Sequence, residues 1–215
     1  MIQNVGVIGS GVVSQVLADG FLKHGFTVMR GSRDPMKLAP WKQGAGAAAL
    51  TGDYAETSRF GELIVLAVRG SAAEEAVKLC GPLDGKIVID TTNPITDAAP
   101  DKGVLPFFTS HQESLMERLQ RLAPKASFVK AFSCVGNAHM VNPDFPGGPP
   151  TMFICGNDDA AKLEVRRVLS HFGWDTEDMG GVEAARAIEP LCMLWCIPGF
   201  ARNQWSHAFK LLKPA

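Results

Sequence analysis

The stretch Val5-Gly6-Val7-Ile8-Gly9-Ser10-Gly11-Val12-Val13-Ser14 decides the fold of this chain. Its first four residues are typical of a buried strand, and the apolar residues after Gly11 recur at helical spacing as far as Phe21. Between strand and helix lies a dinucleotide-binding glycine fingerprint, with Ser14 in place of its third glycine. The alternative is a glycine turn in another α/β fold. We predict that this loop and the free N–H groups of the helix start bind a pyrophosphate through Gly9, Ser10, Gly11, Val12 and Val13.

Short apolar segments alternate with helical patterns after this loop. Residues 63–68 are apolar at every position, which is typical of a strand covered on both faces of a parallel sheet. The alternation predicts an α/β chain with a Rossmann-type, doubly wound, mostly parallel sheet. The predicted strands are 5–8, 26–29, 47–50, 63–68, 86–90 and 128–132; the predicted helices are 12–21, 34–42, 71–80 and one that follows a capping box of Ser110 and Glu113.

The pattern changes after residue 142, where six Pro and Gly residues lie between positions 143 and 150. We expect a dinucleotide-binding Rossmann domain at 1–142 and a small α+β or helical domain at 143–215, which would supply the substrate pocket and dimer contacts. A strand is predicted at 151–155, a helix at 159–171 and a strand at 174–179. From Val182 to Leu212 the pattern is helical, with interruptions at Pro190 and Pro198. Residues 191–197 are apolar all round, which predicts burial against the chain itself or a second subunit.

Composition excludes several classes of partner. The chain has 215 residues, 46% of them hydrophobic, and a net charge of -1, so no basic field predicts binding to nucleic acid or an anionic membrane. The longest apolar stretch, 191–201, contains Pro198 and is too short to span a bilayer. The five cysteines form no CxxC motif, and Cys192 and Cys196 lie one helical turn apart without further ligand spacing. We expect free thiols, no metal and a cytoplasmic protein.

The end of the second predicted strand indicates which dinucleotide is bound. Residues 30–34 are Arg-Gly-Ser-Arg-Asp, without the acid that accepts from the ribose 2′-hydroxyl in NAD-selective folds. Ser32 could donate to a 2′-phosphate, Arg33 could form a forked contact with it or stack on adenine, and Lys37 could add charge. The alternative is a solvated basic turn. The pattern favours NADP.

The carboxyl ends of the later strands should surround the nicotinamide, because open α/β sheets bind ligands there. Hydride transfer between two rings needs close stacking and little acid–base help. Ser133 could bond an acceptor ring atom, Asn93 could fix the carboxamide or the ribose, and His139 could donate a proton to a reduced carbonyl. The alternative for each is a structural loop residue. The predicted cofactor contacts at these ends are Ala67, Val68, Arg69, Asn93, Pro94, Val135 and Gly136.

Several further stretches carry a family resemblance: Gly31-Ser32-Arg33, Lys86–Asp90 with Asn93-Pro94, Val129–Phe132, Val135–Met140, Gly180–Arg186 and Ala208–Leu212. With them, the sequence resembles the coenzyme F420-dependent NADP oxidoreductases, and the STEAP metalloreductases carry a similar domain. The resemblance implies an NADP-binding Rossmann domain, a small C-terminal domain, a homodimer and hydride exchange between NADPH and coenzyme F420 or a flavin.

The chain departs from this family at Arg69-Gly70 and at Ser133, both near the expected nicotinamide site. The identity of the acceptor is therefore open at the level of sequence. One alternative is an NADPH-dependent reductase of a small carbonyl or imine. Another is a non-catalytic module that senses NADPH.

Overall fold

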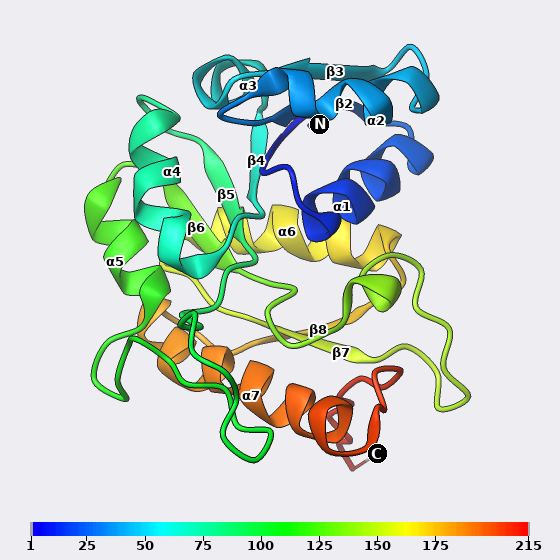
Figure 1. Ribbon diagram of the computed structural model, residues 1–215, viewed down its shortest axis with the longest axis vertical. Helices are drawn as coiled ribbons and strands as arrows, with labels where there is room; N and C mark the ends of the chain where they lie inside the picture. Colours follow the sequence, from blue (N-terminus) through cyan, green and yellow to red (C-terminus); the bar gives the residue numbers. More distant parts are fainter. Residues whose placement is uncertain (1, 215) are drawn as a thin grey trace.

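Six strands form one parallel sheet in the computed structural model, which describes residues 2–214 (Figure 1). They are β1 (Asn4–Ile8), β2 (Thr27–Gly31), β3 (Ala49–Gly52), β4 (Leu63–Leu66), β5 (Ile87–Asp90) and β6 (Ser127–Lys130). The order across the sheet is β3-β2-β1-β4-β5-β6, which confirms the predicted Rossmann-type α/β class. The order reverses between β1 and β4, where sheets of this kind bind their ligands.

Helices cover both faces of the sheet, and two apolar clusters fill the layers between them. Helices α1 (Val12–Lys23) and α6 (Asp159–His171) pack with Leu63 and Val65 in one cluster. Helices α4 (Ala73–Leu79) and α5 (Leu115–Leu122) pack with Ile64 and Leu66 in the other. The uninterrupted apolar run of β4 follows from this double cover, as predicted. The short helices α2 (Ala39–Gly44) and α3 (Tyr54–Phe60) lie near β3 at one edge of the sheet (Figure 1).

The C-terminal part adds a small sheet beside β6. Strands β7 (Thr151–Ile154) and β8 (Asp175–Asp178) are parallel and are joined by α6. An isolated antiparallel bridge between Lys130 and Cys155 links this sheet to β6. Side chains of β7 and α6 enter the same apolar cluster as α1, so one core is shared across residue 142.

The last helix differs from the prediction. Helix α7 (Ala185–Arg202) runs through Pro190 and Pro198 without interruption and ends at Asn203, which has a left-handed φ of 53°. Buried packing by residues such as Trp195 outweighs the cost of an internal proline, about 3 kcal/mol. The apolar segment 191–197 is buried on one side only, because Leu194 is 54% exposed.

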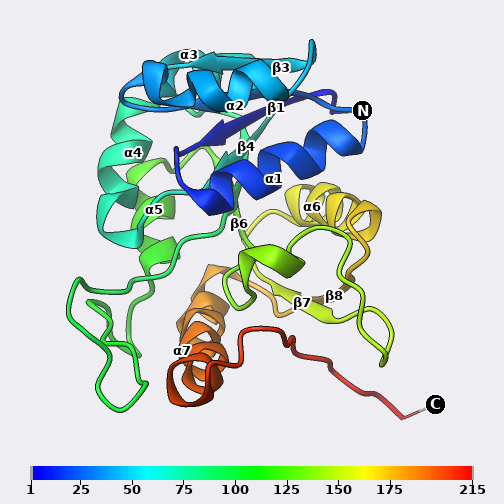
Figure 2. The ribbon, with the colours of Figure 1, turned by 45° about the vertical axis from the view of Figure 1, so that its right-hand side comes forward.

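The helix predicted as far as Leu212 is wrong, since residues 203–214 form a tail without helix or strand (Figure 2). The backbone of this tail is bonded to β7 instead: Thr151 N donates to Phe209 O at 2.9 Å, and Leu211 N donates to Thr151 Oγ1 at 3.0 Å. Among residues 2–214, no helix combines the length and the hydropathy that a bilayer span requires.

The predicted capping box of Ser110 and Glu113 is also wrong. The box belongs to Ser114 and Glu117: Glu117 N donates to Ser114 Oγ at 3.1 Å, and Ser114 N donates to Glu117 Oε2 at 2.7 Å. Arg186 of α7 donates to both carboxylate oxygens, and this contact holds the pKa of Glu117 at about 2. Helix α5 is therefore fixed at its start by the C-terminal helix.

Candidate functional site

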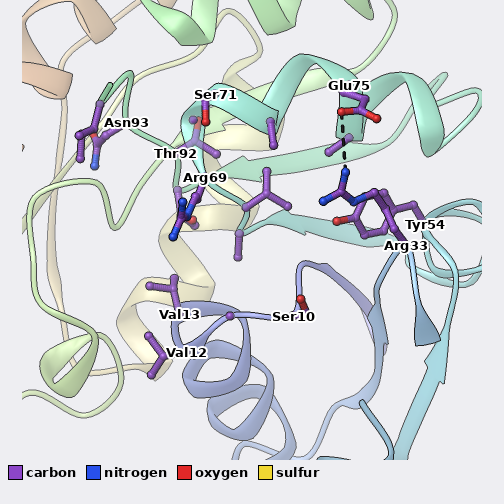
Figure 3. Close-up of a pocket in the computed structure, with 18 of the residues that line it drawn as sticks. Ser10, Val12, Val13, Arg33, Tyr54, Arg69, Ser71, Glu75, Thr92 and Asn93 are labelled. Atoms are coloured by element: carbon purple, nitrogen blue, oxygen red, sulfur yellow. Dashed lines mark ion pairs between the residues drawn. The ribbon is translucent and has the colours of Figure 1, made fainter. Parts of the chain in front are cut away.

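A cleft of about 770 Å³ opens at the carboxyl ends of β1, β4 and β5 (Figure 3). It lies at the reversal of strand order, and its volume is within the range of ligand pockets in proteins. The predicted residues Ser10, Gly11, Val12, Val13, Arg33, Ala67, Val68, Arg69 and Asn93 line it, together with Thr91 and Thr92 of the predicted strand end before Asn93. Tyr54, Ser71 and Glu75 also line it, and sequence reasoning missed these three.

The glycine loop at the start of α1 has the geometry of an anion site. Gly9 has a φ of 138°, and a Cβ there would lie 2.3 Å from the Ala67 carbonyl oxygen. A Cβ at Gly11 would meet nothing within 4 Å, so this side of the loop is open to a ligand. Helix α1 begins without a side-chain cap and without an acid in its first turn. Its first N–H groups and positive dipole end therefore favour a bound phosphate.

A buried arginine supports this loop from below. Arg30 Nε donates to Ser14 Oγ at 3.1 Å, and Arg30 Nη2 donates to the Gly11 carbonyl at 3.3 Å. Ser14 Oγ in turn donates to the Gly9 carbonyl at 2.5 Å. Ser14, in the third glycine position, therefore links Arg30 to the backbone of the glycine loop. Sequence reasoning missed the inward direction of Arg30, although it lies two residues after the buried Val28 and therefore on the same face of β2.

Only one of the three residues predicted for the 2′-phosphate lines the cleft. Arg33 lies at one end of it beside the buried Tyr54, and its Nη1 is 4.0 Å from Glu75 Oε2 (Figure 3). Ser32 is 4% exposed, and its Oγ accepts from Asp34 N at 3.2 Å. Lys37 is exposed and lies outside the lining.

Two unsatisfied polar atoms lie near the opposite end of the cleft, on Asn93, which lines it, and on the buried Ser133, which does not. Asn93 Nδ2 donates to the Ser133 carbonyl at 2.7 Å and so joins the ends of β5 and β6. Asn93 Oδ1 and Ser133 Oγ are buried, and neither has a hydrogen-bond partner within residues 2–214. Phe132, just before Ser133, has a left-handed φ of 60°, which strains the chain at this point. Buried polar atoms without partners are rare, and a ligand is one way to satisfy them.

The remaining predicted residues lie outside the cleft lining. His139 Nε2 is 2.9 Å from Ser206 Oγ, and its ring packs against Phe145. Gly136 faces Trp195, whose Cη2 would lie 2.7 Å from an added Cβ. Val135 is 8% exposed and belongs to the core. Pro94 follows Asn93 without lining the cleft.

A buried charge cluster lies below the cleft floor. Lys130 Nζ is 2.6 Å from Asp90 Oδ2 and 2.8 Å from Glu189 Oε1, and it donates to the Thr92 carbonyl at 2.9 Å. The Lys130 and Asp90 side chains are fully buried, and that of Glu189 is 2% exposed. Burial alone would lower the pKa of Lys130, but the two carboxylates raise it above its ordinary value. The ammonium therefore stays charged and holds the Thr92 loop in place.

Comparison with known proteins finds similarity to NADP-dependent oxidoreductases. Residues 4–94 match the family model of the coenzyme F420-dependent NADP oxidoreductases. Metalloreductase STEAP3 of Rattus norvegicus is 30% identical over 198 residues, which are 90% of this chain; the chain spans 38% of that protein.

Solved structures extend the likeness to the whole fold. A candidate F420-dependent NADP reductase of Arthrobacter sp. FB24 is 29% identical, with a TM-score of 0.89 over 99% of this chain and 100% of that one. An imine reductase of Aspergillus terreus, solved in complex with NADPH4 and dibenz[c,e]azepine, has a TM-score of 0.66. It is 16% identical and covers 93% of this chain and 62% of that one, so it shows a shared fold alone.

Proposed function

We propose that this chain is an NADP-dependent oxidoreductase related to the coenzyme F420-dependent enzymes. It transfers a hydride between NADPH and a flavin-like acceptor, either coenzyme F420 or a flavin. The observation that carries the proposal is the cleft, with an anion site in its wall, Arg33 at one end and the unsatisfied amide oxygen of Asn93 at the other. NADPH bound there would supply a hydride from its nicotinamide ring.

The residues of the cleft fit the parts of the dinucleotide in order. The open side of Gly11 and the first N–H groups of α1 would hold the pyrophosphate. Arg33 would bind the 2′-phosphate, with Ser32 and Lys37 in support from outside the lining. At the other end, Asn93 Oδ1 can accept from the carboxamide N–H₂ group, and Ser133 Oγ can bond the carboxamide or the acceptor ring.

A ring acceptor fits the chemistry of this lining better than a carbonyl does. Reduction of a carbonyl needs a positioned proton donor near the nicotinamide. In the part of the chain that the structure describes, neither His nor Lys lines the cleft, and its one tyrosine, Tyr54, lies beside Arg33 at the opposite end (Figure 3). Hydride transfer between stacked rings asks the protein mainly for alignment and exclusion of water.

We expect NADPH oxidation in the presence of coenzyme F420, FMN or FAD, and none with a panel of small ketones, aldehydes and imines. The measurement follows the nicotinamide absorbance band over time with each acceptor. Turnover with a carbonyl or imine would replace this proposal with the reductase alternative. Cofactor binding without turnover of any acceptor would favour a sensing module.

We also expect Arg33→Ala to weaken NADPH binding by about 10- to 100-fold, because a charge-assisted contact to the 2′-phosphate is lost. NADH has no 2′-phosphate, so its affinity should change less than about twofold and serves as the internal control. Calorimetric titration of both dinucleotides into both proteins measures the two ratios. Tighter binding of NADH by the wild type, or an unchanged ratio in the variant, contradicts the assignment.

A further inference from the structure

Arg30 is the bulkiest of the fully buried side chains among residues 2–214, with an exposed fraction of 1%. Its guanidinium lies under the glycine loop, bonded to Ser14 Oγ and the Gly11 carbonyl, and 4.8 Å from the centre of the Trp41 ring. Each of these contacts is made to a neutral group. These contacts therefore fix the position of the Arg30 side chain but do not neutralise its positive charge.

No carboxylate of the described chain forms an ion pair with Arg30. In residues 2–214, no carboxylate lies within 4.0 Å of its guanidinium nitrogens. Asp19 acts on it only through space, and its Oδ1 accepts from Trp41 Nε1 at 2.7 Å. Burial lowers the pKa of Arg30, and Asp19 offsets this in part. A buried charge in this state is costly unless an opposite charge approaches.

The position of Arg30 adds to this cost in the absence of ligand. Its two hydrogen bonds reach the cap residue and the first turn of α1, where the helix dipole is already positive and where no acid is present. The guanidinium of Arg30 and the positive end of the α1 dipole thus lie together behind the open side of Gly11. An anion bound at that side would offset both the charge of Arg30 and the positive end of the helix dipole. A diphosphate carries more negative charge than a single phosphodiester and would offset them more fully.

We propose that Arg30 is a positioning residue that fixes the glycine loop from below and supplies a buried counter-charge for the pyrophosphate of the dinucleotide. This inference rests on the proposed function and deepens it. Since NADPH and NADH carry the same pyrophosphate, Arg30 serves both equally, whereas Arg33 discriminates between them. Arg30 touches neither dinucleotide directly: its hydrogen bonds stay with Gly11 and Ser14.

The test compares Arg30→Gln, which removes the charge and keeps a donor, with Arg30→Lys, which keeps the charge. Arg59→Gln is the matched control, because Arg59 is an exposed arginine on α3 and does not line the cleft. Titrations with NADPH and with NADH at low and high salt give the affinities. Thermal unfolding without cofactor gives the stability of the free protein.

We expect Arg30→Gln to weaken both dinucleotides by the same factor, about tenfold for a charge in a medium of intermediate dielectric constant. Because the charge is buried, high salt should reduce this factor little. Arg30→Lys should retain most of the affinity, and Arg59→Gln all of it. The melting temperature of the free Arg30→Gln protein should be unchanged or higher, because an uncompensated buried charge has been removed.

Other outcomes overturn the inference. Wild-type affinity in Arg30→Gln shows that the charge does not act on the ligand. A loss confined to NADPH assigns Arg30 to the 2′-phosphate instead. If Arg30→Gln and Arg30→Lys both melt at a lower temperature and lose the same affinity, Arg30 has a purely structural role and its charge does not act on the ligand. If the wild type binds neither dinucleotide, the proposed function fails before the variants are compared.

Discussion

Lys130→Met should lower the free energy of unfolding by about 3–5 kcal/mol, the usual cost of breaking a buried ion pair by removal of one partner. The methionine leaves Asp90 and Glu189 facing each other in the interior without the cation that lies 2.6 and 2.8 Å from them. It also removes the donor to the Thr92 carbonyl. Urea denaturation at neutral pH measures the loss, provided that the transition remains two-state.

Lys125→Met is the matched control for this variant. Lys125 Nζ is 2.9 Å from Asp84 Oδ2, a distance close to those of Lys130, but its side chain is 75% exposed. Exposed pairs contribute about 0–1 kcal/mol, so this variant should unfold almost as the wild type does. If the two lysine variants lost the same stability, the Lys130 cluster could not be what holds α7 and the cleft floor together.

Gly70→Ala should abolish measurable binding of NADPH at concentrations that saturate the wild type, and should destabilise the fold by about 1–3 kcal/mol through overpacking. An added Cβ would lie 1.8 Å from the Asn93 carbonyl oxygen and 3.2 Å from Leu115 Cδ2. The Asn93 carbonyl also accepts from Ile95 N at 2.9 Å, so the loop after β5 cannot yield without losing that bond. Both Gly70 and Asn93 line the cleft, which would be distorted.

Gly44→Ala provides the comparison, because an added Cβ near the end of α2 meets nothing within 4 Å. It should bind NADPH normally and be neutral or slightly stabilised, since alanine favours helix over glycine. Calorimetry for binding and thermal unfolding for stability are measured on both variants. Normal NADPH affinity in Gly70→Ala would show that the contact between these two loops has no part in shaping the site.

The main features of the fold could be predicted from the sequence, because each is a local pattern with one physical solution. The apolar run of β4 predicts a doubly covered strand, and the alternation of strands and helices predicts a parallel sheet. Ser110–Glu113 and Ser114–Glu117 both satisfy the capping pattern, however, and local sequence does not separate them. The choice depends on Glu189, whose carboxylate accepts from Leu115 N and Met116 N at 3.0 Å. The contact comes from a distant segment and leaves no local signal.

Two further misses have signals that were present in the sequence. Asp53 and Glu56 form a capping box that starts α3, and this helix brings Tyr54 to the cleft. The inward direction of Arg30 follows from strand alternation, but a buried arginine without an acid contradicts the usual preference of charged residues for the surface. The strand periodicity predicts that Arg30 points inward, whereas the cost of burying a charge predicts that it points to solvent. Such a conflict is expected at functional sites, and here it occurs beneath the glycine loop.

The contacts of Lys130 also limit how the molecule can move. Thr92 in the cleft is held by Lys130, Lys130 is held by Glu189 on α7, and Glu189 also binds the start of α5. A swing of α7 away from the sheet would strip a buried ammonium of one carboxylate and free two backbone N–H groups at once. The last helix and the cleft floor at Thr92 must therefore move together, and any opening of the cleft requires movement of loops that are not bonded to Lys130.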